Sequence, residues 1–289
     1  MLRRLALVST LLGVSAADAA PEPESVVTTA RKLSPRTDGV MAAYSATYDG
    51  ELATRDLRLR GGVPLVRGDG FGVGLLLGYS ATHLSFDAGG HDDDLELHRY
   101  EATLGGGATL APGRSLRVSI GTAYASDLRA STWSALQLTS SAMVHWVLGP
   151  DDAVIVGAVY TSTAELAPVL PLLGYVHQRD GSRFRFDVFL PRHIRAEYEL
   201  HPRVRGSLGI EAVGNTWAVH EMRSQELVRR SGGVAFGELG FSLTRLMRLE
   251  ARVGLSVMRH TLPAAASAAM LEQSLRPAGF AQLAVLLTP

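Results

Sequence analysis

The chain has 289 residues, of which 28 are basic and 28 are acidic, and 46% are hydrophobic. This balance removes the usual electrostatic argument for a nucleic-acid partner, so none is expected. The sequence contains no cysteine, which excludes disulfides and lipoprotein attachment.

The N-terminus has the layout of an export signal. Two arginines precede an apolar run at residues 5–17, and Ala17-Asp18-Ala19 follows the small-x-small cleavage rule. Residues 1–19 are therefore predicted to be a signal peptide, cleaved near Ala19. The alternative is an uncleaved anchor helix, but a spanning helix needs about 20 apolar residues. Residues 20–38 are polar, proline-containing and without periodicity, so we expect a periplasmic lead-in.

Residues 39–289 are predicted to form one domain, an all-β outer-membrane barrel. Apolar side chains alternate there with polar or small ones, as in Leu249, Ala251 and Val253 against Glu250 and Arg252. This period is typical of strands with one face toward lipid and one toward the lumen. A transmembrane, up-and-down antiparallel barrel of 14 strands is predicted, with strands near residues 40–49, 54–66, 71–86, 95–110, 115–126, 133–148, 153–162, 168–178, 183–190, 193–200, 203–219, 227–243, 247–259 and 276–288.

The connections between these segments alternate between tight and longer ones, as outer-membrane barrels require. The tight ones carry turn chemistry, for example Ala111-Pro112-Gly113-Arg114. The longer links are expected near residues 49–55, 87–95, 126–132, 161–169, 218–232 and 260–275. An alanine-rich stretch at residues 264–270 in the last link predicts a short helix above the barrel. With a periplasmic N-terminus, the longer links face the outside of the cell.

One link breaks this alternation of lengths. Pro191-Arg192 alone joins two segments of about eight residues, shorter than the roughly nine to eleven of a spanning strand. Fusing the two segments would give an odd strand number. Fourteen strands are kept, and twelve remain the alternative.

A resemblance to a known family is carried by residues 171–217. The order is a Gly174-Tyr175 strand, a strand ending in Leu190-Pro191, a Tyr-x-Leu strand at residues 198–200, and a glycine-rich strand leading to Trp217. This resembles the DUF6268 family of bacterial outer-membrane barrels, which implies the barrel fold and carries over no catalytic residue. The chain departs from outer-membrane barrels in general at its end, because many of them finish with an aromatic residue and this one ends in Leu286-Leu287-Thr288-Pro289.

The sequence offers little catalytic, cofactor or metal chemistry. Glycines at alternate positions from Gly68 to Gly74 precede no helix pattern, so a β-turn explains them better than a nucleotide loop. The acidic run Asp92-Asp93-Asp94 is interpreted as a solvated loop, with a divalent cation as the alternative. No Gly-x-Ser-x-Gly elbow is present, and His260-Thr261 lacks the serine of a His-x-Ser pair. No enzyme activity, cofactor or metal is therefore predicted.

The candidate functional residues are the charged side chains at the alternate strand positions that are expected to face the lumen. They carry both signs, and charges facing lipid would cost about 2–4 kcal/mol each near the midplane. The preferred interpretation is a set of ion pairs that stiffens and plugs the interior; the alternative is a polar pathway. The predicted lumenal charges are Arg58, Arg60, Arg117, Arg185, Asp187, Arg195, Glu197, Glu199, Arg205, Glu211, Glu250 and Arg252.

Three classes of function follow from these features. The favoured hypothesis is a structural or surface barrel with a charge-plugged lumen, in which the longer links carry partner contacts. A passive pore or small-solute transporter is the alternative, and a lipid-modifying enzyme at the rim has the least support. The expected partners are outer-membrane lipid, the barrel-assembly machinery and, for the pore, a small solute.

Overall fold

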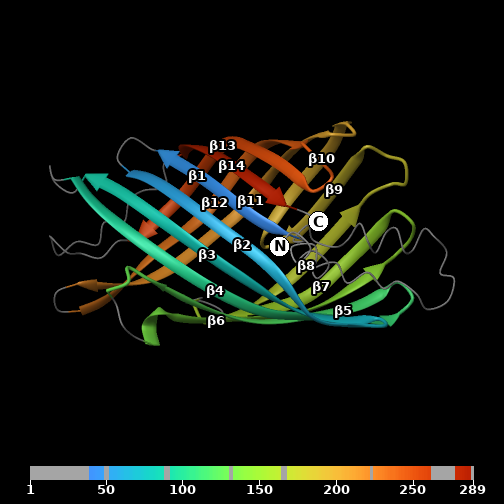
Figure 1. Cartoon of the computed structure of the whole chain (residues 1–289), viewed down its shortest axis with the longest axis horizontal. Helices are drawn as coiled ribbons and strands as arrows, with labels where there is room; N and C mark the ends of the chain where they lie inside the picture. The colour runs from blue at the N-terminus through green and yellow to red at the C-terminus, as the bar shows by residue number, and fades with distance from the viewer. Residues whose placement is uncertain are drawn as a thin grey trace, which may run out of the picture.

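The computed structural model describes residues 39–48, 52–87, 92–129, 133–163, 168–221, 224–261 and 277–287. These residues form a closed antiparallel barrel of 14 strands, in which β1 pairs with β14 (Figure 1). The strands are β1 Val40–Tyr48, β2 Leu52–Gly68, β3 Phe71–Asp87, β4 Asp92–Ala111, β5 Arg114–Ser126, β6 Leu136–Val147, β7 Asp152–Thr161, β8 Val169–His177, β9 Phe184–Leu190, β10 His193–His201, β11 Val204–Glu221, β12 Ser224–Ser242, β13 Met247–Thr261 and β14 Pro277–Leu287.

The predicted fold class and strand number are confirmed. The short segments on either side of Pro191-Arg192 are separate strands, β9 and β10, so the alternative of twelve strands is wrong. Within the described residues, no helix has both the length and the apolar character needed to cross a membrane. The predicted signal peptide, the lead-in and the helix at residues 264–270 lie outside the described residues.

The side chains of each strand alternate between the two faces of the barrel wall. In β13, Val253 and Leu255 are well exposed on the outside, whereas Ser256 and Met258 are buried inside. Leu208 and Ile210 of β11 are likewise exposed, at 70% and 53%. The outer face is thus a surface of large apolar side chains, which is the pattern that a lipid-facing barrel requires.

The two ends of the barrel differ in how the strands are joined. At one end, here called the turn end, the connections are tight and need residues in the left-handed region. Gly113 and Gly181 occupy such positions, both with φ of +71°, where a residue with a Cβ would be strained. At the other end, the loop end, the strands are joined by residues 49–51, 88–91, 127–135, 162–168, 191–192, 222–223 and 262–276.

Several predicted links at the loop end are shorter than expected. The link predicted at residues 218–232 is wrong, because β11 runs to Glu221 and β12 begins at Ser224. Their long ladder continues through this whole segment, with Trp217 paired to Val228. The strand predicted from residue 133 begins instead at Leu136, after a short 3-10 helix, η2 (Trp133–Ala135). The glycines and charges of residues 218–232 resemble loop composition, but the two segments pair with each other regardless.

The barrel is pinched near its loop end, where two strands from opposite walls meet. Ala218 of β11 pairs with Ser126 of β5 in a parallel bridge, and the Asp127 amide donates to the Ala218 carbonyl at 3.2 Å. The short β9–β10 hairpin makes this contact possible. The ladder between β10 and β11 begins at His193 and Glu211, so β11 continues beyond it without β10 beside it. Figure 1 shows the contrast between this short hairpin and the long strands β2 to β4.

Candidate functional site: the barrel interior

The inner face of β9 to β13 carries charges that oppose each other across neighbouring strands. Arg185 and Glu197 are paired positions of β9 and β10, as are Asp187 and Arg195. Opposite charges at directly paired positions stabilise a sheet. The same arrangement recurs between β12 and β13, in the paired positions Glu238 and Arg252.

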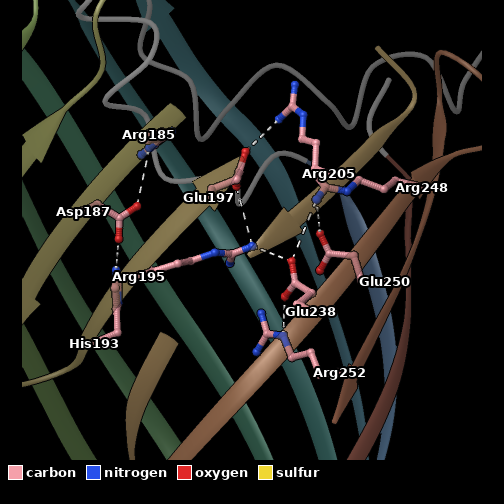
Figure 2. A network of polar contacts seen from close by, with 10 residues as sticks. All are labelled: Arg185, Asp187, His193, Arg195, Glu197, Arg205, Glu238, Arg248, Glu250 and Arg252. Atoms are coloured by element: carbon pink, nitrogen blue, oxygen red, sulfur yellow. Dashed lines mark hydrogen bonds and ion pairs between the residues drawn. The ribbon is translucent and has the colours of Figure 1, made fainter. Parts of the chain in front are cut away.

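Glu238 of β12 is the centre of this network (Figure 2). Its side chain is 1% exposed and accepts hydrogen bonds from Arg195 of β10 and Arg252 of β13. Arg248 lies 3.9 Å from the same carboxylate and 3.0 Å from Glu250. One buried carboxylate therefore interacts with three arginines from two different strands. These interactions compensate the free-energy cost of removing the carboxylate from water.

The network continues outward from Glu238 through second partners of the same arginines. Arg195 lies 3.6 Å from Glu197, which Arg205 also contacts at 3.3 Å. Arg252 reaches Glu211 at 3.4 Å, and its guanidinium lies 4.7 Å from the ring centre of Phe236. On the other side of β10, Asp187 lies 2.8 Å from His193 Nε2.

A second charged group lies closer to the loop end and joins strands that are not neighbours. Arg230 of β12 donates to Asp56 of β2 at 2.8 Å, and both side chains are almost fully buried. Strands β13, β14 and β1 separate these two strands in the wall, so the pair crosses the interior. Asp56 also accepts from Thr82 at 2.6 Å, and Arg58 lies 3.9 Å from it.

A third group connects β2 and β4 to the pinch. Arg60 lies 2.9 Å from Glu101, which also approaches Arg99. Arg99 donates to Gln137 of β6, and Gln137 donates to the backbone carbonyl of Thr216 on β11 at 2.6 Å. The polar chain thus links the wall around β4 to the inward-leaning end of β11.

The loop end of the interior is filled by apolar side chains. The pinch brings β1 to β5 and β11 to β14 into a narrower ring, and the buried cluster inside it spans β2, β3, β4, β5, β11 and β12. Trp217 is 1% exposed and Leu97 is fully buried. The members of this loop-end cluster are Leu52, Leu84, Leu97, Ala125, Trp217, Val219 and Val228.

Two cavities remain between the loop-end cluster and the turn end. One of about 280 Å³ lies between β1, β2 and β11 to β14 and is lined by Arg58, Arg60 and Arg230, among others. The second, of about 360 Å³, is lined mainly by β5 to β13 and includes both charged and apolar side chains. Arg192, at the tip of the β9–β10 hairpin, borders both cavities.

Most of the predicted lumenal charges come together in these groups. The ion pairs described above include Arg58, Arg60, Asp187, Arg195, Glu197, Arg205, Glu211, Glu250 and Arg252. Arg185 also joins them, because it lies 3.5 Å from Asp187. Arg117 lines the second cavity. Glu199 faces the same side as Glu197 but forms no ion pair within the described residues.

Sequence reasoning missed the two residues that organise the interior, Glu238 and Arg230. Glu238 stands among four glycines of β12, where few large side chains mark the alternation. Arg230 lay where the predicted link at residues 218–232 overlaps the strand predicted near residues 227–243, and Asp56 lay near the start of the strand predicted near residues 54–66. The two residues could have been found from the alternation of side chains along residues 224–242, if these residues are treated as one strand. That alternation places Arg230, Val234, Phe236 and Glu238 on the inner face.

The acidic run Asp92-Asp93-Asp94 was interpreted as a loop, but it forms the start of β4. Asp94 accepts a hydrogen bond from Ser85 at 2.6 Å and lies 3.4 Å from His83. The side chains of Asp92 and Asp93 lie outside the described residues. Among those that are described, no group of three or more histidines and carboxylates is placed to hold a metal ion.

The comparisons with known proteins concern the architecture. No protein-family model and no curated protein sequence matches the chain. Similar solved structures include an outer-membrane channel from Pseudomonas putida F1, 10% identical over 86% of this chain and 95% of that one, with a TM-score of 0.47. Omp33 of Acinetobacter baumannii is 12% identical over 87% and 98%, with a TM-score of 0.42.

The outer membrane phospholipase A of Escherichia coli is 14% identical over 97% of this chain and 98% of that one, with a TM-score of 0.38. These solved structures are a channel, another outer-membrane protein and a phospholipase. Likeness at this level says nothing of what this barrel binds, transports or converts. The resemblance to the DUF6268 family stays a prediction.

Proposed function

We propose that the protein is an outer-membrane barrel whose lumen is closed along its axis, and that it is neither an open diffusion pore nor an enzyme. The outward apolar face supports the membrane location. Aromatic side chains also gather on that face near the turn end, as an interfacial girdle would. Its members are Phe71, Trp146, Tyr175, Phe184, Tyr198 and Phe241.

The loop-end cluster is the observation that carries the closure. It lies inside the ring formed by the β5–β11 bridge and excludes water from that section, since Leu84, Leu97 and Trp217 are at most 1% exposed. An apolar constriction resists the passage of ions because it dewets. The Glu238 network obstructs the lumen further along the axis. The loop-end cluster and the Glu238 network together support a lumen that is closed at two successive positions along its axis. The part of the lumen that the loop-end cluster fills is called the closed section below.

A small-solute transporter is the second candidate, and the two interior cavities favour it. They leave space between the closed section and the turn end that a purely structural barrel does not need. For either candidate, the proposed partners are outer-membrane lipid, because the outer face is apolar, and the barrel-assembly machinery, because the topology is that of an outer-membrane barrel.

Planar-bilayer recording of the refolded protein tests the closure. The parent should insert without the steady conductance of an open pore, and Trp217→Ala should raise the open probability because it removes the largest member of the cluster. Trp146→Ala is the matched control, since that tryptophan faces outward beside Arg114. Heat-dependent gel migration checks that each variant is folded, and Leu84→Ala replaces Trp217→Ala if the latter does not fold. Steady conductance of the parent would overturn the proposal, as would equal recordings from the inward and outward tryptophan variants.

A further inference from the structure

A further cavity, called the side cavity below, lies at the tip of the β9–β10 hairpin and opens on the outside of the wall. Its volume is about 230 Å³. Its apolar lining, on the outward side of the wall, consists of Leu190, Pro191, Ile194, Ile210, Ala212 and Gly233. Arg192 and Glu211 also border it, and the same two residues line both interior cavities. The side cavity and the interior therefore meet at the hairpin tip.

The wall of the barrel is interrupted directly beyond this tip. The ladder between β10 and β11 begins at the pair His193 and Glu211. Beyond Glu211, β11 has no paired strand on this side, among the described residues, until Ala218 meets Ser126 of β5. The side cavity thus lies at the lower edge of a break in the hydrogen-bonded wall.

The hairpin tip lies within the hydrocarbon layer on the outside of the barrel. Phe184 and Tyr198 are paired positions at the start of β9 and the end of β10, and both belong to the aromatic girdle of the turn end. Leu190 lies six residues beyond Phe184 on β9. A rise of about 3.4 Å per residue and a strand tilt of about 40° place Leu190 about 16 Å above the girdle. The apolar band of such barrels is about 25 Å tall, so the tip does not reach the outer interface.

Arg192 is a charged side chain at this depth and has no ion pair within the described residues. It is exposed at the tip of the hairpin. The nearby carboxylates have other partners, since Asp187 lies 2.8 Å from His193 and Glu211 lies 3.4 Å from Arg252. An ionisable side chain at membrane depth is costly, and it is typical of a site that binds a partner of opposite charge. The tip therefore offers one guanidinium beside an apolar cavity that faces lipid.

We propose that the hairpin tip binds a free long-chain fatty acid that approaches from the membrane. The carboxylate accepts hydrogen bonds from Arg192 at the break in the wall, and the alkyl chain lies in the side cavity against Leu190, Ile194 and Ile210. Hydrogen bonds between guanidinium and carboxylate groups are among the strong ones. A fatty acid fits better than a phospholipid, because its small head can reach below the outer interface.

Fluorescence quenching by brominated lipids tests the proposal on the full-length protein in lipid vesicles. Leu173→Trp places a reporter on the outer face of β8, directly opposite Leu190 of β9. Leu283→Trp places the same reporter on exposed β14, away from the hairpin. The parent protein, with its three tryptophans, supplies the background. The probes are dibromostearate, its methyl ester, and phosphatidylglycerol with the same brominated chains, all at about pH 9, where the fatty acid stays ionised in a membrane.

Dibromostearate should quench the Leu173→Trp reporter at about tenfold lower concentration than its methyl ester, which lacks the charge. The two probes should quench the Leu283→Trp reporter equally. Equal quenching by the acid and the ester beside the hairpin would overturn the carboxylate site. Quenching by the brominated phosphatidylglycerol as strong as that by the acid would assign the tip to phospholipid and overturn the fatty-acid proposal. None of these outcomes depends on whether the axial path conducts, which planar-bilayer recording measures separately.

Variants in the Leu173→Trp background locate the binding. Arg192→Gln should abolish the preference for the acid over the ester, whereas Arg245→Gln, at an exposed turn on the opposite end, should preserve it.

Gly233→Leu should weaken quenching by the acid about tenfold, because it fills the side cavity. A Cβ atom at Gly233 would lie 3.7 Å from its nearest neighbour, the Glu211 carbonyl oxygen, so the wall accommodates the side chain. Gly237→Leu is the matched control on the same face of β12, with a Cβ contact of 3.6 Å to Leu208, and should change nothing. Heat-dependent gel migration checks that each variant is folded. A preference for the acid that survives both Arg192→Gln and Gly233→Leu in folded protein would place the site elsewhere and overturn the proposal.

Discussion

Removing the charge of Glu238 should destabilise the barrel more than removing any other interior carboxylate. In Glu238→Gln, Arg195, Arg248 and Arg252 lose the carboxylate that they share, in an environment where the side chain is 1% exposed. Removing one partner of a buried ion pair lowers the free energy of unfolding by about 3–5 kcal/mol. Each arginine keeps a second carboxylate within 3.6 Å, namely Glu197, Glu250 and Glu211 respectively. The expected loss in free energy of unfolding is therefore at the lower end, about 3 kcal/mol.

Urea titration of the refolded protein, under lipid or detergent conditions where unfolding is reversible, measures this loss. Glu199→Gln is the matched control, because Glu199 faces the same side but forms no ion pair within the described residues; it should cost less than about 1 kcal/mol. Adding Arg252→Gln to Glu238→Gln should cost clearly less than the sum of the two single changes, since the two side chains interact directly. Equal losses for Glu238→Gln and Glu199→Gln, or strict additivity in the double variant, would refute the central role of Glu238.

Three further predictions concern the wall, the orientation and a local strain. Val253→Arg should cost about 2–4 kcal/mol in urea titration if Val253 faces lipid near the midplane, whereas Ser182→Arg at a turn should cost almost nothing; equal costs would contradict the assigned faces. Because the chain has no cysteine, Trp133→Cys at the loop end should react with an impermeant maleimide on whole cells and Arg245→Cys at the turn end should not; the reverse result would invert the barrel. Leu128 is an exposed residue with φ of 63°, so Leu128→Gly should stabilise the barrel by up to about 1 kcal/mol, and a clear destabilisation would show that its side chain matters to the loop.

The strands were predictable where lipid selects one parity of side chains. Leu249, Ala251 and Val253 repeat on one face because every second residue meets hydrocarbon, and this period survives without any tertiary information. The tight turns were predictable for a related reason, since Gly113 and Gly181 occupy backbone conformations that few other residues adopt. Local sequence patterns were therefore enough to predict the number of strands and to predict that charged side chains face the interior.

The pinch was not predictable, because it depends on a contact between strands far apart in sequence. Ser126 and Ala218 meet across the barrel, and neither carries a local signal of that pairing. The partners of Arg230 and Glu238 depend in the same way on the curvature and register of the whole wall. Parity places a charge inside a barrel, but the closed geometry decides which charge it meets.

The outer parity of β11 nevertheless contains a signal for the pinch, once the whole strand is considered. Toward the turn end, the outward-facing positions of β11 are Leu208 and Ile210, which are exposed. Toward the loop end, the positions on the same face are the small residues Ala212, Gly214, Thr216 and Ala218. Such small side chains offer little to lipid, but they allow two backbones to approach closely. Ala218 is fully buried beside Ala135 and Tyr124. The small residues of upper β11 thus explain why this strand leans against β5.

Enlarging Ala218 should therefore separate the two strands and open the closed section. In Ala218→Leu the added isopropyl group has no space beside Ala135, and overpacking of this kind costs about 1–3 kcal/mol. The open probability in planar bilayers should rise together with the loss in free energy of unfolding, because both follow from the displaced β11. Ala212→Leu, on the same face of the same strand but exposed, is the control and should leave both measurements unchanged. If Ala218→Leu is destabilised but stays closed, the contact between β5 and β11 stabilises the barrel without controlling access to its lumen.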